Sequence, residues 1–150
     1  MPISEEDGQI NWPSEKGLYF FDARIVSSWR IYANGEPWEL LNGGAISYYA
    51  SRIFLTNRAF PHRRRHDPAA HLGPTLSRSI SGGLHEDLDI VNHGLKPVIF
   101  QLEIALRCDF ADIFEVKAVT LCAAAGFPTE WSASHQHLRT TSATPTLPAQ

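Results

Sequence analysis

The stretch LHEDLDIVNHGLKPVIFQLEIALRCDF, residues 84–110, decides the fold class of this chain. In its second half, VIFQLEIALRCDF (98–110), large apolar residues occupy every second position, and mostly polar or charged residues fall between them. A period of two residues is typical of a β-strand with one buried face. We therefore predict a strand whose core-facing side chains are those of Val98, Phe100, Leu102, Ile104, Leu106 and Cys108.

The first half of that stretch, LHEDLDIVN (84–92), has the same period. It places three apolar residues on one face and mostly polar residues on the other. Glu86 is the one charge on the apolar face, so we expect it to lie near an end of the strand or to have a partner. Gly82-Gly83 directly before it predicts a hairpin turn that joins it to a strand at Leu76–Ser81.

A second hairpin is predicted in the first third of the chain. Asn34-Gly35 supplies the two residues with positive φ that a type I′ turn needs, and strands at Ile25–Ala33 and Glu36–Leu41 flank it. Pro37 lacks a backbone N–H group, so we expect its strand to lie at an edge of the sheet.

The other segments are also typical of β-structure. Gly43-Gly44 predicts a turn, Ala45–Thr56 reads as one bent strand or two short ones, and Phe114–Lys117 alternates as a strand does. No segment of useful length has a helical period. We therefore predict an all-β fold: a single-domain antiparallel β-sandwich with an irregular loop at 61–74 and a poorly ordered C-terminal tail.

Composition excludes several classes of protein. The chain has 150 residues, 43% hydrophobic and 19% charged, as in an ordinary globular domain. Its net charge of −3 predicts no attraction to nucleic acid or to an anionic membrane surface. The uncharged run 118–127 is too short to span a bilayer, and the acidic N-terminus does not resemble a signal peptide. We expect a cytoplasmic protein with reduced cysteines.

No motif for metal, cofactor or nucleophile chemistry is present in the sequence. His135 and His137 could share one side of a strand, but a metal-dependent enzyme would need a third ligand that converges on them. Asp109, Asp112 and Glu115 lie close together along the chain, whereas a glycosidase needs two carboxyl groups that face each other across a cleft. We therefore predict no catalytic residue, no metal and no cofactor.

Aromatic residues give the one candidate binding site. Several aromatic rings could stack on the apolar faces of sugar rings, among them Trp12, Trp29, Trp38, Trp131, Tyr48 and Tyr49. The one plausible group is Trp29, Tyr32 and Trp38, which flank the Asn34-Gly35 turn. This alternative makes the chain an autonomous carbohydrate-binding module, and it requires that the three rings lie exposed on one face.

Three stretches together resemble one known family. GLYFFDARIVSSWRIYANGEPWELL (17–41), SRSISGGLHEDLDIVNHGLKPVIFQLEIALRCDFADIFEVK (77–117) and TEWSASHQHLRTT (129–141) are similar to the N-terminal domain of bacterial amylo-α-1,6-glucosidase (glycogen debranching) enzymes. The most specific part runs from GGLHE to DFADIFEV. The chain departs from the family at Phe21 and Ala23, where Arg and Thr are more frequent.

The resemblance implies a function for the parent protein. In this family the N-terminal domain is a non-catalytic β-sandwich, and two carboxylates of a following (α/α) toroid hydrolyse α-1,6 branches of an α-glucan. The chain alone is then expected to have no glycosidase activity and to pack against that toroid. The resemblance also implies a division into an extension at 1–16, the domain at 17–141 and a tail at 142–150.

The segment AVTLCAAAGF (118–127) does not fit this pattern, because it has neither charge nor period. One choice of codons for residues 117–127, read in another frame, gives RHIVRRGRI, the basic segment expected here in the family. Similar shifts give family-like or polar sequence for 61–74 and for the tail. We therefore predict that 61–74, 118–128 and 142–150 are out of frame and that the chain is a truncated or frame-damaged fragment. The alternative is that these segments are genuine: a variable loop, a short apolar element and a disordered tail.

Overall fold

The computed structural model describes residues 1–57, 72–118 and 128–141. The predictions made for the tail, and those for nearly all of 61–74 and 118–128, lie outside these residues. The strands in chain order are β1 (Pro2–Ile3), β2 (Gly17–Phe20), β3 (Ala23–Val26), β4 (Ser28–Ala33), β5 (Glu36–Ser47), β6 (Ala50–Asn57), β7 (Leu72–Ile80), β8 (Leu84–Asn92), β9 (Leu102–Arg107), β10 (Ala111–Asp112), β11 (Thr129–Ser132) and β12 (His137–Thr140). The described residues include one short helix, α1 (Ile113–Lys117).

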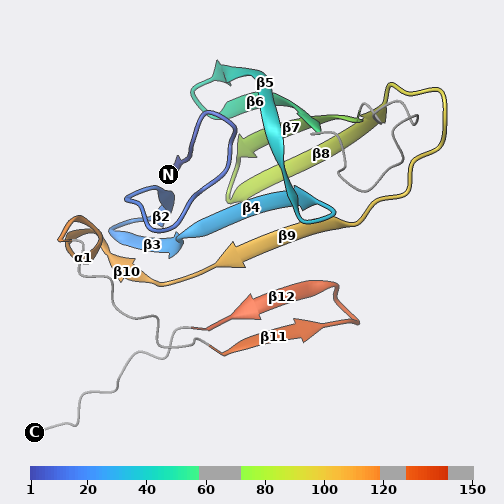
Figure 1. The fold of residues 1–150 in the computed structure, drawn as a ribbon. Coiled ribbons are helices and arrows are strands. Elements are labelled where there is room, and N and C mark those ends of the chain that lie inside the picture. Colours follow the sequence, from blue (N-terminus) through green and yellow to red (C-terminus); the bar gives the residue numbers. More distant parts are fainter. Residues whose placement is uncertain (58–71, 119–127, 142–150) are drawn as a thin grey trace, which may run out of the picture.

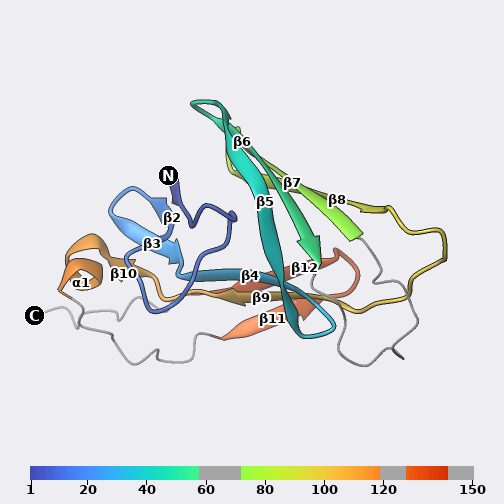
Figure 2. The same cartoon turned by 45° about the horizontal axis from the view of Figure 1, so that its top comes forward.

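The largest sheet is antiparallel and has the strand order β8-β7-β6-β5-β4-β9. It curls on itself at β5, which pairs with β4 only at the two residue pairs next to their turn and with β6 along the rest of its length. As a result β4 and β9 form one layer and β5 to β8 cross over it as a second layer (Figure 1). Figure 2 shows the same crossing from a second direction. The predicted all-β antiparallel fold is confirmed.

The hydrophobic core fills the space between these two layers. Buried side chains from β4, β5, β6 and β7 meet there, and partly buried ones from β8 and from the segment before β9 pack against them. The buried members are Ile31, Ala33, Trp38, Ile53, Leu55, Leu72 and Leu76. The largest contribution to the core therefore comes from strands that precede the stretch which decided the fold class.

The Asn34-Gly35 turn has the predicted backbone, with φ of 51° and 78° at its two residues. The prediction that Pro37 marks an edge strand is wrong, because β5 lies between β6 and β4. In a two-residue hairpin the pair next to the turn exchanges both hydrogen bonds and the following pair exchanges none. Pro37 is in that second pair, opposite Tyr32, and β6 pairs with β5 only from Trp38 onward. Its missing N–H therefore costs the sheet no hydrogen bond.

The predicted turn at Gly43-Gly44 is also wrong. Both glycines lie inside β5 and pair with β6, close to a shift of register between Leu40 and Asn42. Gly43 allows this close pairing, because a Cβ there would meet Ile53 at 3.2–3.4 Å. The chain turns instead at Tyr48-Tyr49, between β5 and β6.

The β7–β8 hairpin is confirmed, with Gly82 in the left-handed region at φ 69°. Strand β7 begins at Leu72, earlier than predicted, so residues 72–74 belong to a strand and not to the irregular loop. Glu86 has the partner that its position demanded, because it forms an ion pair with Arg78 of β7.

A second, four-stranded sheet has the order β1-β2-β3-β10. It includes the first two residues of the predicted strand Ile25–Ala33, which is divided at Ser27 into β3 and β4. Residues before Gly17 join the same packing: β1 pairs with β2, and the buried Ile10 forms a backbone bridge to Trp29 of β4.

Strand β9 departs most from the prediction. It begins at Leu102 rather than Val98, and its apolar face is not buried. Leu102, Ile104 and Leu106 are 39%, 55% and 41% exposed. They lie on the same side of the sheet as their pairing partners on β4, among them the fully buried Ile31. The predicted face is therefore correct, and the predicted burial is wrong, because β9 is the last strand of the curled sheet and none of the strands among the described residues covers this face.

Residues 113–117 form the helix α1, so the strand predicted at Phe114–Lys117 is wrong. The Asp112 side chain accepts a hydrogen bond from the N–H of Phe114, and the Glu115 side chain accepts one from the N–H of Asp112. This capping box satisfies backbone groups at the start of a helix. Four alternating residues are too few to outweigh such a signal.

Candidate functional site

The curled sheet has an open side between its two edge strands, β8 and β9. A cavity of about 340 Å³ lies there, with a mostly apolar wall to which both edges contribute. Its lining includes Ile10, Val26, Trp29, Leu84, Glu86 and Leu106. We use the name open side for this cavity together with the exposed row Leu102, Ile104 and Leu106 on β9.

The wall of the open side contains polar groups as well. Arg78 and Glu86 form their ion pair there, with side chains 5% and 12% exposed. Arg78 also donates a hydrogen bond from Nη2 to the carbonyl of Gly8 at 2.7 Å. In the described part of the chain, Trp29 Nε1 and Glu86 Oε2 are buried without a hydrogen-bond partner. A group that covered the open side could satisfy this donor and this acceptor.

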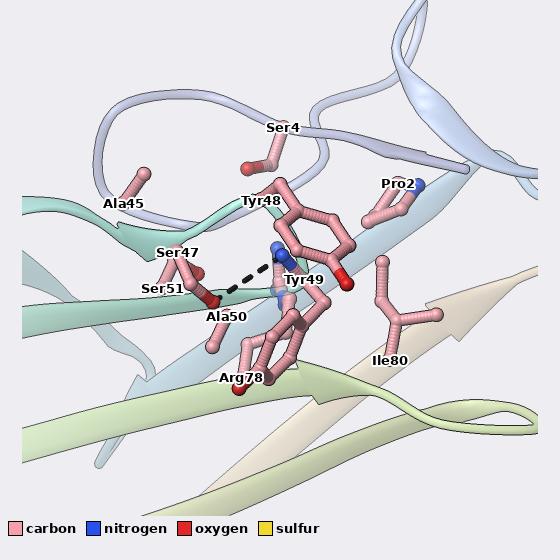
Figure 3. A pocket seen from close by; sticks show the side chains of 10 residues that line it. All are labelled: Pro2, Ser4, Ala45, Ser47, Tyr48, Tyr49, Ala50, Ser51, Arg78 and Ile80. Carbon is pink, nitrogen blue, oxygen red and sulfur yellow. Dashed lines mark hydrogen bonds between the residues drawn. The ribbon is translucent and has the colours of Figure 1, made fainter.

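A second hollow lies at the turn between β5 and β6. Ser47 pairs with Ala50, so Tyr48 and Tyr49 form a two-residue turn. Their rings contact each other edge to face with centroids 4.9 Å apart, and they are 98% and 49% exposed. The hollow beside them has a volume of about 240 Å³ and is lined by serines, Arg78 and the two tyrosines (Figure 3). We call this site the tip pocket.

The structure separates the three aromatic residues predicted to bind sugar. Trp38 is buried in the core, where its ring meets Phe100 edge to face. Trp29 lines the open side, whereas Tyr32, an odd number of positions along the same strand, faces the opposite way and lies against the guanidinium of Arg30. The three rings do not share one exposed face. Sugar contact by Trp29, Tyr32 or Trp38 stays a prediction.

The clustered carboxylates have structural partners. Asp109 pairs with Arg24 of β3, and both side chains are almost entirely buried. Asp112 and Glu115 cap α1. The pair formed by Arg24 and Asp109 links the four-stranded sheet to the end of β9.

The histidines considered as metal ligands lie at the β11–β12 hairpin. The rings of His135 and His137 stack with centroids 5.6 Å apart. Among the described residues, no group of three or more His, Cys, Asp or Glu side chains converges as a metal site would require.

Cys108 follows directly after β9 and is half-buried. Burial raises the pKa of its thiol, and a hydrogen bond with the Thr140 side chain of β12 opposes part of that rise. The thiol is therefore a poor nucleophile at neutral pH. Cys122 lies outside the described residues.

Two features, the open side and the tip pocket, were not predicted from the sequence. The open side could not be predicted from periodicity, because an alternating pattern identifies the apolar face of a strand but does not tell whether another element covers it. The tip pocket had a direct signal, since Tyr48-Tyr49 is the one pair of adjacent tyrosines in the chain. One bent strand over Ala45–Thr56 would have placed the pair inside a strand, whereas the alternative of two short strands leaves room for the turn that the structure has there.

Comparison with known protein families identifies the chain. The model of a family described as the N-terminal domain of (some) glycogen debranching enzymes matches residues 1–145. The chain therefore belongs to this family of all-β domains. No curated protein gave a significant match, and neither did any solved structure. Within the described residues, no helix has the length and apolarity that crossing a membrane requires.

Proposed function

We propose that this chain is the non-catalytic accessory domain of an amylo-α-1,6-glucosidase-type enzyme and that its open side packs on the catalytic domain of that enzyme. The parent enzyme would hydrolyse α-1,6 branches of an α-glucan with carboxylates from an (α/α) toroid. The observation that carries the proposal is the exposure of Leu102, Ile104 and Leu106, which lie on the core side of their sheet.

The energetic argument concerns the water on this face. Burying one large aliphatic side chain fully is worth about 1.5–3 kcal/mol, so a row of three half-exposed ones favours a covering partner. The cavity beside the row extends the apolar surface toward β8. Apolar centres of this kind are typical of stable interfaces between domains. Membership of the family implies a catalytic domain in the parent protein, which makes that domain the expected partner.

The assignment of a non-catalytic role rests on the carboxylates. Asp109 is neutralised by Arg24, and Asp112 and Glu115 are used by α1. These three carboxyl groups are therefore engaged in structural contacts. Glycoside hydrolysis instead requires two carboxyl groups that face each other across a cleft.

A binding experiment tests the docking proposal. The chain is titrated, without sugar, into the separately produced catalytic domain of the parent enzyme, and the affinity is measured by calorimetry. We expect Ile104→Lys to weaken association at least tenfold, because a desolvated lysine on the row costs more than about 1.4 kcal/mol. Ala105→Lys is the matched control, since Ala105 is exposed on the opposite face of the same strand.

Equal weakening by both variants would contradict the open side as the docking surface. Absence of any association between the unmodified chain and the catalytic domain would contradict the proposal as a whole. Circular dichroism of each variant excludes loss of the fold as the cause.

The frame-damage hypothesis and the cytoplasmic location stay predictions. Resequencing the gene through the codons for 61–74, 118–128 and 142–150 tests the first. Recovery of RHIVRRGRI would support it, and confirmation of the present sequence would end it. Fractionation of the producing cells tests the second.

A further inference from the structure

We propose that the tip pocket binds a segment of α-linked glucan, with Tyr48 and Tyr49 stacking on its sugar rings. The choice of an α-glucan rests on the proposed function, whereas the choice of a neutral sugar rests on the chemistry of the site. The site differs from the open side and from the three aromatic residues that the sequence suggested.

The composition of the turn is the first argument. Two-residue hairpin turns favour Asn, Asp and Gly, because these residues adopt the required backbone at low cost. Here both positions carry tyrosine, and neither is among the residues with positive φ. Tyrosine adopts this backbone at ordinary cost, so what needs explaining is the placement of two bulky aromatic side chains at an exposed tip, where Tyr48 gains almost no packing with the core.

The exposure of the rings is the second argument. Tyr48 is 98% exposed, so it contributes almost nothing to the core, and its ring contacts that of the half-exposed Tyr49. Ile80, which lines the same hollow, is 41% exposed. Rigid aromatic rings that present a flat apolar face and a polar hydroxyl are well suited to the two-faced surface of a sugar ring.

The polar lining of the pocket is the third argument. Ser4, Ser47 and Ser51 bring hydroxyl groups to the hollow next to the tyrosines (Figure 3). Hydroxyl groups both donate and accept hydrogen bonds, which matches the hydroxyl groups of a sugar. The volume of about 240 Å³ is below the range of about 300–1,000 Å³ that drug-sized ligands occupy. The hollow therefore suits a small unit, such as one ring of a chain that continues into solvent.

Charge decides between ligand classes. Arg78 is the only charged residue among the described residues that line the pocket. Its charge is balanced by Glu86, and its side chain is already held by that ion pair and by Gly8. An anionic ligand such as a phosphate or nucleic acid would find no free positive charge here. A neutral ligand rich in hydroxyl groups does not need a positive charge in the pocket.

The experiment uses the full chain and two probes. Glycogen is included in a native gel to detect retardation, and maltoheptaose is titrated by calorimetry to measure affinity. We expect binding by the unmodified chain and a loss of about five- to tenfold for Tyr48→Ala and for Tyr49→Ala, which corresponds to one stacking contact each. Tyr48→Phe should retain most of the affinity, because the ring face remains.

Two controls make the result specific. Trp131→Ala removes an exposed aromatic ring on β11, away from the tip pocket, and should leave binding unchanged. Cellohexaose, which has β-linkages, should bind more weakly than maltoheptaose. Melting curves of each variant confirm that this exposed turn can be altered without unfolding.

Three results would overturn the proposal: no retardation by glycogen, equal binding by Tyr48→Ala, or equal affinity for cellohexaose. The docking experiment is carried out without sugar, so the two proposals fail independently. A chain that associates with the catalytic domain but ignores glycogen refutes only the tip pocket, and weakened docking by Tyr48→Ala would reassign the tyrosines to that interface.

Discussion

Strands β7 and β9 both have alternating sequences, but the apolar face is buried on β7 and about half-exposed on β9. On β7 the side chains of Leu72, Pro74 and Leu76 are buried as their period predicts. On β9 the corresponding apolar row is about 40–55% exposed. The difference lies in their neighbours, because β7 lies between β6 and β8, whereas β9 pairs only with β4 within the large sheet.

The period of a strand and the burial of its apolar face are therefore separate properties. An alternating pattern identifies the apolar face of a strand, and the arrangement of the other strands decides whether anything covers it. An apolar face left open at the edge of a domain is informative, since it indicates the surface at which a partner is expected.

The largest expected effect concerns the ion pair that joins β7 to β8. Glu86→Ala should destabilise the chain by about 4 kcal/mol, because it leaves the buried charge of Arg78 without a partner. Asp87→Ala, on the exposed face of the same strand, should change stability by less than about 0.5 kcal/mol. Urea unfolding measures both, and similar losses would show that the pair formed by Arg78 and Glu86 is not buried in solution.

A smaller effect compares the two strands directly. Leu76→Ala should cost about 3 kcal/mol in the free energy of unfolding, since it leaves a cavity in the core. Ile104→Ala should cost less than about 1 kcal/mol in the isolated chain, because its side chain remains 55% exposed. Equal costs would mean that β9 is covered in solution, and the open side would then lose its role as a docking surface.

The smallest expected effect is the contribution of the Cys108 thiol to the pH dependence of stability. Cys108 follows β9 directly, at the end of the open side. Burial raises the pKa of this thiol above its ordinary value of 9.0, so the folded state favours the neutral form. Its contribution to stability is present below pH 9 and is lost as the pH rises through the raised pKa. Melting temperatures between pH 8 and about pH 10.5 should therefore fall less for Cys108→Ala than for the unmodified chain.

Tyr19 also contributes to the pH dependence of stability in this alkaline range. Burial raises the pKa of its hydroxyl as well, with the charge of Arg24 opposing the rise, so it adds alkaline destabilisation of the same sign. The Cys108→Ala variant keeps the alkaline destabilisation due to Tyr19 and removes only the contribution of the thiol. An unchanged pH profile in Cys108→Ala would indicate that the end of β9 is as open as its middle.

Local chemistry explains which turns could be predicted. Asn34-Gly35 and Gly82-Gly83 turn as expected, because residues that tolerate positive φ stand between two alternating segments. Gly43-Gly44 has the same local signal and forms no turn. Glycine also serves where two strands approach closely, and only the position of Ile53 on β6 distinguishes these uses.

The candidate sites were less predictable than the fold. Trp29, Tyr32 and Trp38 are neighbours around one hairpin, yet burial and the alternation of β4 send them to different surroundings. The tip pocket depends on residues as distant along the chain as Ser4, Tyr48 and Arg78. No spacing rule connects positions of that kind.

The sequence by itself determined the all-β class, the apolar faces of β8 and β9, two of the turns, the need of Glu86 for a partner and the family. Each of these follows from the backbone preferences of single residues or from a period of two, both of which are local. Only the tertiary structure decided that β5 curls the sheet, that the apolar row of β9 is about half-exposed and that two tyrosines occupy the tip. These features depend on which strands become neighbours, and that outcome depends on the packing of the whole chain.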